Sequence, residues 1–220
     1  MKPVRVFYEK KDTAKYISHL DINRCFQRAI RRAEVAIWYT EGFNPHAYIT
    51  FALPLSLGYE SEYETMDMRL LDEDMPLDEV MARLNRALPA GLRVWKAAMP
   101  SDKPDAIAWS DYRVLMAPEG EAAQETAQKF RAFLERESIP AKKRTKRGER
   151  EIDLRPYVQL LSLACTPEGV QAELRLAAGS EMNVNPTLVL DCFCAACGTK
   201  FDHVQVTRTA VWNKKGENFA

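Results

Sequence analysis

Arginine side chains recur along one side of the segment from residue 18 to residue 33, in a pattern that could bind an anion. The arginines are Arg24, Arg28, Arg31 and Arg32. At helical spacing they fall roughly opposite the apolar residues Ile22, Phe26 and Ile30. Arginine makes bidentate, charge-assisted contacts with phosphate oxygens, so this stripe is a candidate for following a nucleic-acid backbone. A solvated helix face is the alternative, because charged outer faces are common in amphipathic helices.

A denser run of positive charge lies between residues 142 and 150. Its candidate nucleic-acid contacts are Lys142, Lys143, Arg144, Lys146 and Arg147. A run with one acidic residue, Glu149, predicts a mobile electrostatic arm suited to RNA, to DNA or to an acidic partner. An ordinary disordered loop of the same charge is the alternative.

Two histidines are candidates for acid–base chemistry. His46 ends a loop in which Gly42 permits a positive φ and Asn44 is held extended by Pro45. His19, in the first turn of an expected helix, could lie beside it. Two imidazoles, nearby hydroxyls and a cationic surface are enough for general acid–base cleavage of a phosphodiester. Histidines at helix starts and turns are more often structural, so we assign no catalytic residue.

Three cysteines near the C-terminal end raise the question of a metal site. Cys192, Cys194 and Cys197 precede His203 in the order of some zinc ligands. However, Leu190, Cys194 and Cys197 share one face of an expected helix, where a free cysteine behaves as a small apolar residue. We therefore predict core packing, no metal and no other cofactor, with the zinc site as the weaker alternative.

Composition and missing motifs exclude several classes of protein. The 220 residues balance 31 Lys and Arg against 31 Asp and Glu, which argues against a wholly basic nucleic-acid binder. A glycine-rich phosphate loop and a His-Glu-x-x-His motif are both absent, so a nucleoside triphosphatase or a metalloprotease is not expected. No apolar run has the length of a signal peptide or a membrane helix, and five cysteines are an odd number. We expect a cytoplasmic protein with reduced thiols and no membrane contact.

Periodicity places these residues on an order of strands and helices that occurs twice. In the first half, two-residue alternation and helical spacing predict strands at 4–9, 49–54, 59–71 and 92–97, with helices from Ser18 to Ala33 and from Pro76 to Leu88. In the second half, the expected elements are a strand at 112–116, a helix at 123–134, a hairpin of 158–164 with 170–176, a helix at 186–197 ended by Gly198, and a strand at 203–212.

This order predicts an α+β protein made of two tandem ferredoxin-like halves, each β-α-β-β-α-β. We expect the halves to span residues 1–99 and 110–220, with residues 100–109 as a linker rich in Pro, Asp and Ser. The element order supports a duplication, although the two halves share little similarity residue by residue.

Several short motifs resemble a known family. They are Tyr16-Ile-Ser-His-Leu-Asp21, which contains Ser18 and Asp21; Gly42-Phe43-Asn44-Pro45-His46; Ala52-Leu-Pro-Leu55 with Gly58; and Ile152-Asp153-Leu-Arg155-Pro156. With the arginines that follow the first motif, the chain resembles the radical-SAM-associated protein family, a bacterial domain of unknown function. The resemblance covers most of the chain. It implies a radical SAM enzyme as the partner and implies no established activity.

Three hypotheses follow. The first is a non-enzymatic accessory module that binds RNA for a radical SAM partner, and the second is a docking module for that enzyme in which the loop from Gly42 to His46 and the segment from Ile152 to Pro156 form the contact surface. The third is a metal-independent endoribonuclease, by analogy with CRISPR RNA-processing proteins that pair two ferredoxin-like halves. We rank an accessory module that combines the first two above the endoribonuclease.

Overall fold

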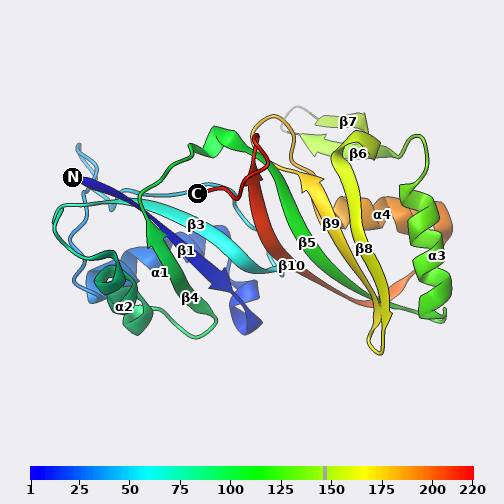
Figure 1. Ribbon diagram of the computed structural model, residues 1–220, viewed down its shortest axis with the longest axis horizontal. Coiled ribbons are helices and arrows are strands. Elements are labelled where there is room, and N and C mark those ends of the chain that lie inside the picture. The colour runs from blue at the N-terminus through cyan, green and yellow to red at the C-terminus, as the bar shows by residue number, and fades with distance from the viewer. Residues whose placement is uncertain (146–147) are drawn as a thin grey trace. The chain divides into compact units, whose positions relative to one another are not determined.

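The described chain folds into strands and helices in a mixed α/β architecture (Figure 1). The computed structural model describes residues 1–145 and 148–220. The described chain divides into two units, Met1–Ala106 together with Asn218–Ala220, and Ile107–Glu217. The division falls within the expected linker, and the last three residues belong to the first unit.

The first unit is a sheet of antiparallel strands in the order β4-β1-β3, with the short β2 also paired to β3. Its elements are β1 (Lys2–Lys10), the 3₁₀ turn η1 (Asp12–Tyr16), α1 (His19–Arg32), β2 (Ile49–Phe51), β3 (Glu60–Leu70), α2 (Leu77–Ala87), β4 (Leu92–Ala98) and η2 (Pro104–Ala106). The predicted strands and both predicted helices are thus present. Pro76, which was predicted to lie in the first turn of this helix, is instead the N-cap of α2, one residue before the first helical residue.

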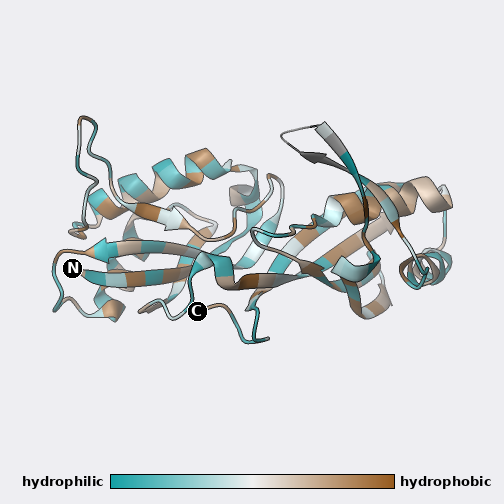
Figure 2. Ribbon diagram, turned by 90° about the horizontal axis from the view of Figure 1, so that it is seen from above, coloured by the Kyte–Doolittle hydropathy of each residue, from teal (hydrophilic) through white to brown (hydrophobic). Residues whose placement is uncertain are grey.

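One core holds this unit together. Alternation along β1 directs Val4 and Val6 to the same face, and these residues are paired in register with Met68 and Met66 of β3. All four are buried with Phe26 of α1. Figure 2 shows the amphipathic pattern of α1, on which hydrophobic and hydrophilic residues alternate. Because α1 and α2 both bury apolar residues in this core, they cover the same face of the sheet.

The second unit has the strand order β10-β5-β9-β8, again antiparallel. Its elements are β5 (Ile107–Pro118), α3 (Ala123–Leu134), β6 (Pro140–Thr145), β7 (Gly148–Asp153), η3 (Arg155–Tyr157), β8 (Val158–Thr166), β9 (Gly169–Ala177), α4 (Pro186–Cys197) and β10 (Phe201–Asn213). The predicted helix at 186–197 is confirmed. Gly198 ends it in the left-handed conformation, with φ 69°.

The expectation of a mobile arm between residues 142 and 150 is wrong for its described part. β6 and β7 pair as an antiparallel hairpin, with Ala141 opposite Ile152 and Lys142 opposite Glu151. The small apolar pair and the opposite charges across the strands favour this pairing, and charge counting along the sequence misses it. Lys146 and Arg147 lie outside the described residues.

The described helices include none that is long and apolar enough to cross a membrane.

Candidate nucleic-acid interface

The arginine face of α1 is exposed as the spacing predicts. Arg24, Arg28, Arg31 and Arg32 are all exposed, whereas the inward residues Ile22, Phe26 and Ile30 are buried. Ser18 sets the start of the helix, because its Oγ accepts a hydrogen bond from the backbone N–H of Asp21 at 3.2 Å. The cap therefore fixes the phase at which the arginines point away from the core.

Arg24 is partly neutralised within the same turn. Its Nη1 lies 3.1 Å from Oδ1 of Asp21, and both side chains are more than half exposed, at 65% and 56%. Ser18 Oγ donates to the other carboxylate oxygen at 2.7 Å. The pKa of the Asp21 carboxyl is held below its usual value by these contacts. The hydrogen bond from Ser18 has the larger effect and the contact with Arg24 the next largest. An exposed pair of this kind contributes little to stability and leaves Arg24 able to change partner.

Arg28 and Arg31 are the least engaged cations of the helix. Their guanidinium groups form no hydrogen bond or ion pair with the part of the chain that the structure describes. Arg28 stands four residues before Arg32, so the two side chains are neighbours on the helix surface. Together these residues present positive charge along the last two turns of α1.

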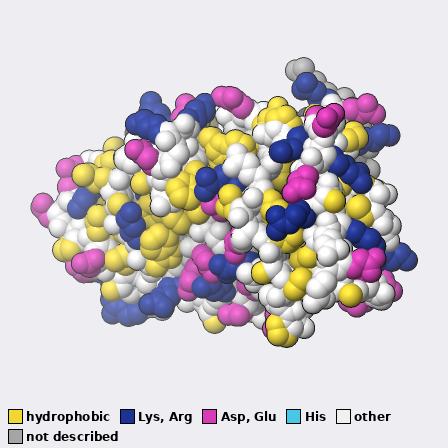
Figure 3. Space-filling view, turned by 45° about the vertical axis from the view of Figure 1, so that its right-hand side comes forward, with side chains coloured by type: hydrophobic (Ala, Val, Ile, Leu, Met, Phe, Trp, Pro, Cys, Tyr) yellow, Lys and Arg dark blue, Asp and Glu magenta, His cyan; other side chains and the backbone are white. Residues whose placement is uncertain are grey.

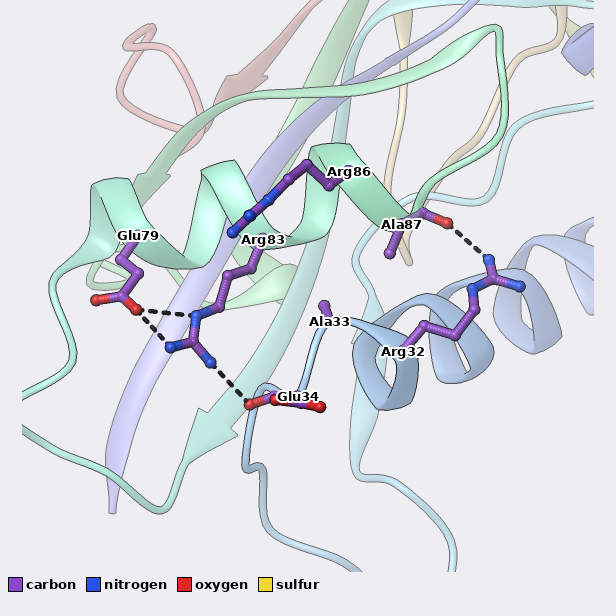
Figure 4. A pocket seen from close by; sticks show the side chains of 7 residues that line it. All are labelled: Arg32, Ala33, Glu34, Glu79, Arg83, Arg86 and Ala87. Carbon is purple, nitrogen blue, oxygen red and sulfur yellow. Dashed lines mark hydrogen bonds and ion pairs between the residues drawn. The ribbon is translucent and has the colours of Figure 1, made fainter.

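A hollow between the end of α1 and α2 continues this charge (Figure 4). It has a volume of about 530 Å³ and is lined by Arg32, Ala33, Glu34, Glu79, Arg83, Arg86 and Ala87. Three guanidinium groups line it against two carboxylates, so the hollow itself carries a net positive charge. We define the arginine surface as Arg28, Arg31, Arg32, Arg83 and Arg86.

The arginines that line the hollow are held to different degrees. Both Nε and Nη2 of Arg83 donate to Oε1 of Glu79, at 2.9 and 2.5 Å, and Nη1 donates to the backbone oxygen of Glu34 at 3.2 Å (Figure 4). Nη2 of Arg32 donates to the backbone oxygen of Ala87 at 2.6 Å. Nε of Arg86 makes a longer contact, 3.4 Å, within its own helix. These contacts orient the arginines and leave several of their N–H groups for an anion.

A strained helix end shapes the wall of this hollow. After the C-cap Ala33, Glu34 adopts a left-handed conformation with φ 54°. Its N–H donates to the oxygen of Arg31, and the N–H of Val35 donates to the oxygen of Ile30, both at 3.2 Å. This is a Schellman ending with glutamate where glycine is usual. The turn directs the backbone oxygen of Glu34 at Arg83, which joins α1 to α2.

Sequence reasoning missed Arg83 and Arg86. They lie three residues apart in α2 and could have been found as a short basic stripe. Nothing in the local sequence shows that this stripe faces the end of α1. On the face of the molecule in Figure 3, Lys and Arg side chains are interspersed with Asp and Glu.

The two candidate histidines have separate surroundings. His46 is exposed, and its Nδ1 lies 3.0 Å from Thr40 Oγ1 and 3.2 Å from the backbone oxygen of Asn44. His19 is also exposed, and its ring meets Phe51 edge to face at 5.3 Å. No hydrogen bond or ring contact joins the two imidazoles, both of which lie in described parts of the chain.

His19 instead borders a small cavity that the sequence reasoning did not predict. The cavity, about 10 Å³, is large enough for about one water molecule and is also lined by Tyr8, Lys10 and Glu64. Lys10 and Glu64 are 3% and 5% exposed, and Lys10 Nζ donates to the backbone oxygen of Ile17 at 2.9 Å. The contact ties the end of β1 to the segment before α1. The burial of Lys10 could have been predicted from the sequence, because alternation along β1 puts Lys10 on the same face as Val6 and Tyr8.

The remaining motif residues lie in loops and turns of the backbone. In the predicted loop, Gly42 has φ 120° and Phe43 is completely exposed. Asp153 accepts hydrogen bonds from the backbone N–H groups of Arg155 and Ile139, at 2.9 and 2.8 Å. These two bonds, in that order, lower the pKa of the Asp153 carboxyl. The carboxylate thereby fixes the chain where it enters and leaves the β6–β7 hairpin.

The cysteines on α4 are half-buried, and burial raises the pKa of Cys192 and of Cys194. His203 is exposed on β10. Within residues 1–145 and 148–220, no group of three or more His, Cys, Asp or Glu side chains is placed to hold a metal ion. In the basic run, Lys142 is exposed. Of Lys143 and Arg144 only the backbone pairing is described.

Comparisons with known proteins give a family and a fold. The family described as "Uncharacterized protein conserved in bacteria (DUF2344)" matches residues 4–186. No curated protein sequence matches the chain. Among solved structures, one similar chain belongs to the crystal structure of a Cbf5-Nop10-Gar1 complex, with 10% identity and a TM-score of 0.50. That match covers 94% of this chain and 48% of the other, so this chain spans about half of its length. At this identity the likeness concerns the fold alone.

A second match is the crystal structure of an unknown protein from Galdieria sulphuraria, with 13% identity over 94% of this chain and 98% of the other. Its TM-score of 0.29 is too low to support an argument.

Proposed function

We propose, from the premise that this chain belongs to the bacterial family described as "Uncharacterized protein conserved in bacteria" (DUF2344), that it is a non-catalytic accessory module that binds RNA through its arginine surface. The observation that carries the proposal is the hollow between α1 and α2, which Arg32 of α1 lines together with Arg83 and Arg86 of α2 (Figure 4). Residues distant in sequence thus contribute to one cationic site.

The geometry suits a run of phosphates better than one isolated anion. Arg31 and Arg32, three and four residues after Arg28, are both its surface neighbours on α1, with about 5–6 Å between the Cβ atoms of such neighbours in any helix. Cations at this spacing can contact successive phosphates of one strand. The anchored Arg83 would act differently, because its contacts with Glu79 hold its guanidinium in place.

RNA binding by such a surface is expected to be sensitive to salt. Each phosphate neutralised by an arginine releases condensed counterions, so affinity falls as salt concentration rises. Because the chain carries no net charge, this attraction depends on local cationic patches such as the arginine surface.

The proposal treats each unit as one ferredoxin-like half. The support is the strand order: β4-β1-β3 with β2 on β3 in the first unit, and β10-β5-β9-β8 in the second. Both orders follow from a strand-helix-strand-strand-helix-strand chain in which the first and third strands are central neighbours. The β6–β7 hairpin is then an insertion in the second half.

A partner enzyme of the radical SAM class completes the proposal. Its support is the sequence resemblance at Tyr16-Ile-Ser-His-Leu-Asp21 and at the loop from Gly42 to His46. Exposed apolar side chains accompany both motifs, with Tyr16 68%, Leu20 69% and Phe43 106% exposed. Apolar side chains that gather into a contiguous exposed patch mark protein interaction sites, and these three are the candidates for such a patch.

The test is RNA binding by a charge-reversed variant. A fluorescently labelled RNA from native cells is titrated with the full chain and with the variant Arg28→Glu/Arg31→Glu/Arg32→Glu, and anisotropy is followed at low and moderate salt. We expect the variant to lose binding at least a hundredfold, because three phosphate contacts become repulsive. Unchanged affinity would reject the arginine surface.

The matched control reverses the same number of charges elsewhere. Lys103, Lys200 and Lys215 are exposed outside the arginine surface, so Lys103→Glu/Lys200→Glu/Lys215→Glu has the same net charge as the test variant. We expect it to keep most of the affinity. An equal loss in both variants would show that only net charge matters.

Gels of the same mixtures, with His19→Ala and His46→Ala in parallel, detect cleavage of the RNA. RNA cleaved by the wild type and spared by these variants would favour the endoribonuclease instead.

A further inference from the structure

Helix α4 has two apolar faces, and the core uses only one of them. Val189, Leu190 and Phe193 are buried in the second unit. Leu188, Cys192, Ala195 and Ala196 follow at the spacing i, i+4, i+7 and i+8 and so form a second stripe on the helix surface. Figure 2 shows the result, because hydrophobic colour extends along most of α4. A helix that is apolar on both faces is normally covered on both.

The second stripe borders a hollow within the second unit. Its volume is about 450 Å³, within the roughly 300–1,000 Å³ of common small-molecule sites. The end of α3 contributes Phe133, and the chain into β6 contributes Ile139 and Ala141. These three side chains are at most 5% exposed, so the floor is apolar and rigidly packed. Ala195 and Ala196 are small and leave the space open.

Two cations and one carboxylate border the same hollow. Arg136 and Lys142 are exposed, and neither forms an ion pair with a described side chain. The guanidinium of Arg136 lies over the ring of Phe133, 5.3 Å from its centroid. Asp191 is the carboxylate, so positive charge is in excess at the rim. An apolar floor beneath a cationic rim is complementary to a molecule with an apolar body and an anionic group.

Cys192 forms part of the wall. Its side chain is half-buried, and its pKa is raised by burial and by the charge of Asp191. The thiol therefore stays protonated near neutral pH and contributes apolar surface. Its position also makes it a reporter of whether the hollow is occupied.

We infer that the hollow between α3, β6 and α4 is a binding site for a small anionic amphiphile, an aromatic or aliphatic body that carries one carboxylate, sulfonate or phosphate group. The apolar body lies against Cys192, Ala195 and Ala196, and the anionic group lies toward Arg136 and Lys142. The site shares no residue with the arginine surface, and the inference does not depend on RNA binding.

The experiment compares two fluorescent probes of similar body and different charge. The full chain is titrated with anionic 1-anilinonaphthalene-8-sulfonate and with neutral N-phenyl-1-naphthylamine. We expect saturable binding of one molecule of the anionic probe. The variant Arg136→Gln/Lys142→Gln should bind the anionic probe about tenfold more weakly and the neutral probe unchanged, because a charge-assisted contact is lost for the anion alone. Equal weakening for both probes would overturn the assignment of the rim.

A second variant tests the floor. Ala195→Phe fills the hollow from an exposed position and should weaken both probes at least tenfold, whereas Ala82→Phe, at an exposed position of α2, should weaken neither. Far-UV circular dichroism and thermal melts establish that the variants are folded, because loosely packed states also bind the anionic probe. Undiminished binding by folded Ala195→Phe would overturn the site. If the wild-type chain self-associates at the concentrations used for the probes and Ala195→Phe stays monomeric, a second copy of the chain covers this face instead.

Alkylation offers a readout free of fluorescence. N-ethylmaleimide modification is mapped by mass spectrometry with and without saturating anionic probe. We expect the probe to slow modification of Cys192 at least fivefold and to leave that of the exposed Cys165 unchanged. Equal rates at Cys192 with and without the probe would place the probe elsewhere.

Discussion

The guanidinium of Arg5 on β1 and the carboxylate of Asp67 on β3 form a two-point ion pair, with Nε 2.6 Å from Oδ1 and Nη2 2.7 Å from Oδ2. The second unit contains the same pair with the partners exchanged. There Asp111 on β5 accepts hydrogen bonds from Nε and Nη2 of Arg175 on β9, at 2.7 and 2.9 Å. In each unit the pair bridges the first strand and the strand that precedes the last helix. Equivalent strands thus carry opposite charges at this contact.

Aromatic rings accompany both pairs. The guanidinium of Arg5 lies 4.2 Å from the ring centroid of Phe219, and that of Arg175 lies 4.5 Å from the ring centroid of Trp212. The side chain of Arg5 is 1% exposed, and its Nη1 has no hydrogen-bond partner among the described residues. A cation in this position depends strongly on its one carboxylate partner.

The first prediction concerns that dependence. Asp67→Asn should lower the free energy of unfolding by about 3 kcal/mol, because it leaves the guanidinium of Arg5 buried without a counter-charge. Urea denaturation followed by circular dichroism measures the change. As a control, Glu173→Gln removes a carboxylate that pairs with the 41% exposed Arg113 at 3.0 Å. That variant should lose less than about 1 kcal/mol. Similar losses in both variants would contradict the role assigned to Arg5.

The second prediction separates phosphate contacts from general attraction. If Arg31 contacts one phosphate of a single-stranded RNA, Arg31→Ala should reduce the slope of log affinity against log salt by about 0.7. Anisotropy titrations at several salt concentrations measure the slope. Lys103→Ala, outside the arginine surface, should leave it unchanged. A lower affinity with the same slope would mean that Arg31 acts through packing rather than through a phosphate.

The third prediction concerns the anchor in the hollow. Glu79→Gln removes the carboxylate that holds Arg83 and raises the net positive charge of the arginine surface. RNA affinity should therefore rise about two- to fivefold at low salt, as for other charges near an interface. Glu125→Gln on α3 makes the same change of net charge beside Lys129 and should have no such effect. Weaker RNA binding by Glu79→Gln would show that Arg83 must be held in place to bind.

The fourth prediction concerns the strained helix end. Glu34→Gly should raise the free energy of unfolding by about 1 kcal/mol, because glycine adopts the left-handed conformation without the clash of a Cβ atom. Thermal and urea unfolding both report the change. Gly42, with φ 120°, gives the reverse comparison, and Gly42→Ala should destabilise the chain. A loss of stability in Glu34→Gly would mean that the glutamate side chain makes a contribution larger than the strain.

The fifth prediction concerns the cap of α1 and pH. Ser18→Ala should cost about 1 kcal/mol at neutral pH, because the N–H of Asp21 loses its acceptor. The variant should also raise the pKa of Asp21 toward its usual value, since the hydrogen bond from Ser18 is the largest cause of its depression. A lowered folded-state pKa contributes stability above the unfolded-state pKa, and this stability is lost as pH falls through the folded-state pKa.

The difference in stability between wild type and Ser18→Ala should therefore shrink in acid and persist at neutral pH. Carboxyl chemical shifts of Asp21 across a pH titration measure the pKa directly. An Asp21 pKa that is the same in both proteins would contradict the contact with Ser18.

Local pattern was enough to predict most helices and strands. Ser18, Gly198 and the alternation of β9 each act within a few residues of the chain, so their effect can be read from neighbouring positions. The β6–β7 hairpin was missed because consecutive residues in it are charged, so the sequence shows no two-residue alternation of apolar and polar side chains there. The cross-strand partner of Lys142 is Glu151, and that pairing is visible only once the register is known.

The sequence by itself determined that α1 presents arginines on the side opposite its core face, because helical geometry fixes which residues share a side. Only the tertiary structure decided that Arg83 and Arg86 of α2 lie beside Arg32, and that Lys10 and Glu64 share a buried cavity. Periodicity acts over a few residues, whereas these groupings depend on which helices and strands pack together across tens of residues. That packing is set by the complementary shapes of the buried side chains in three dimensions.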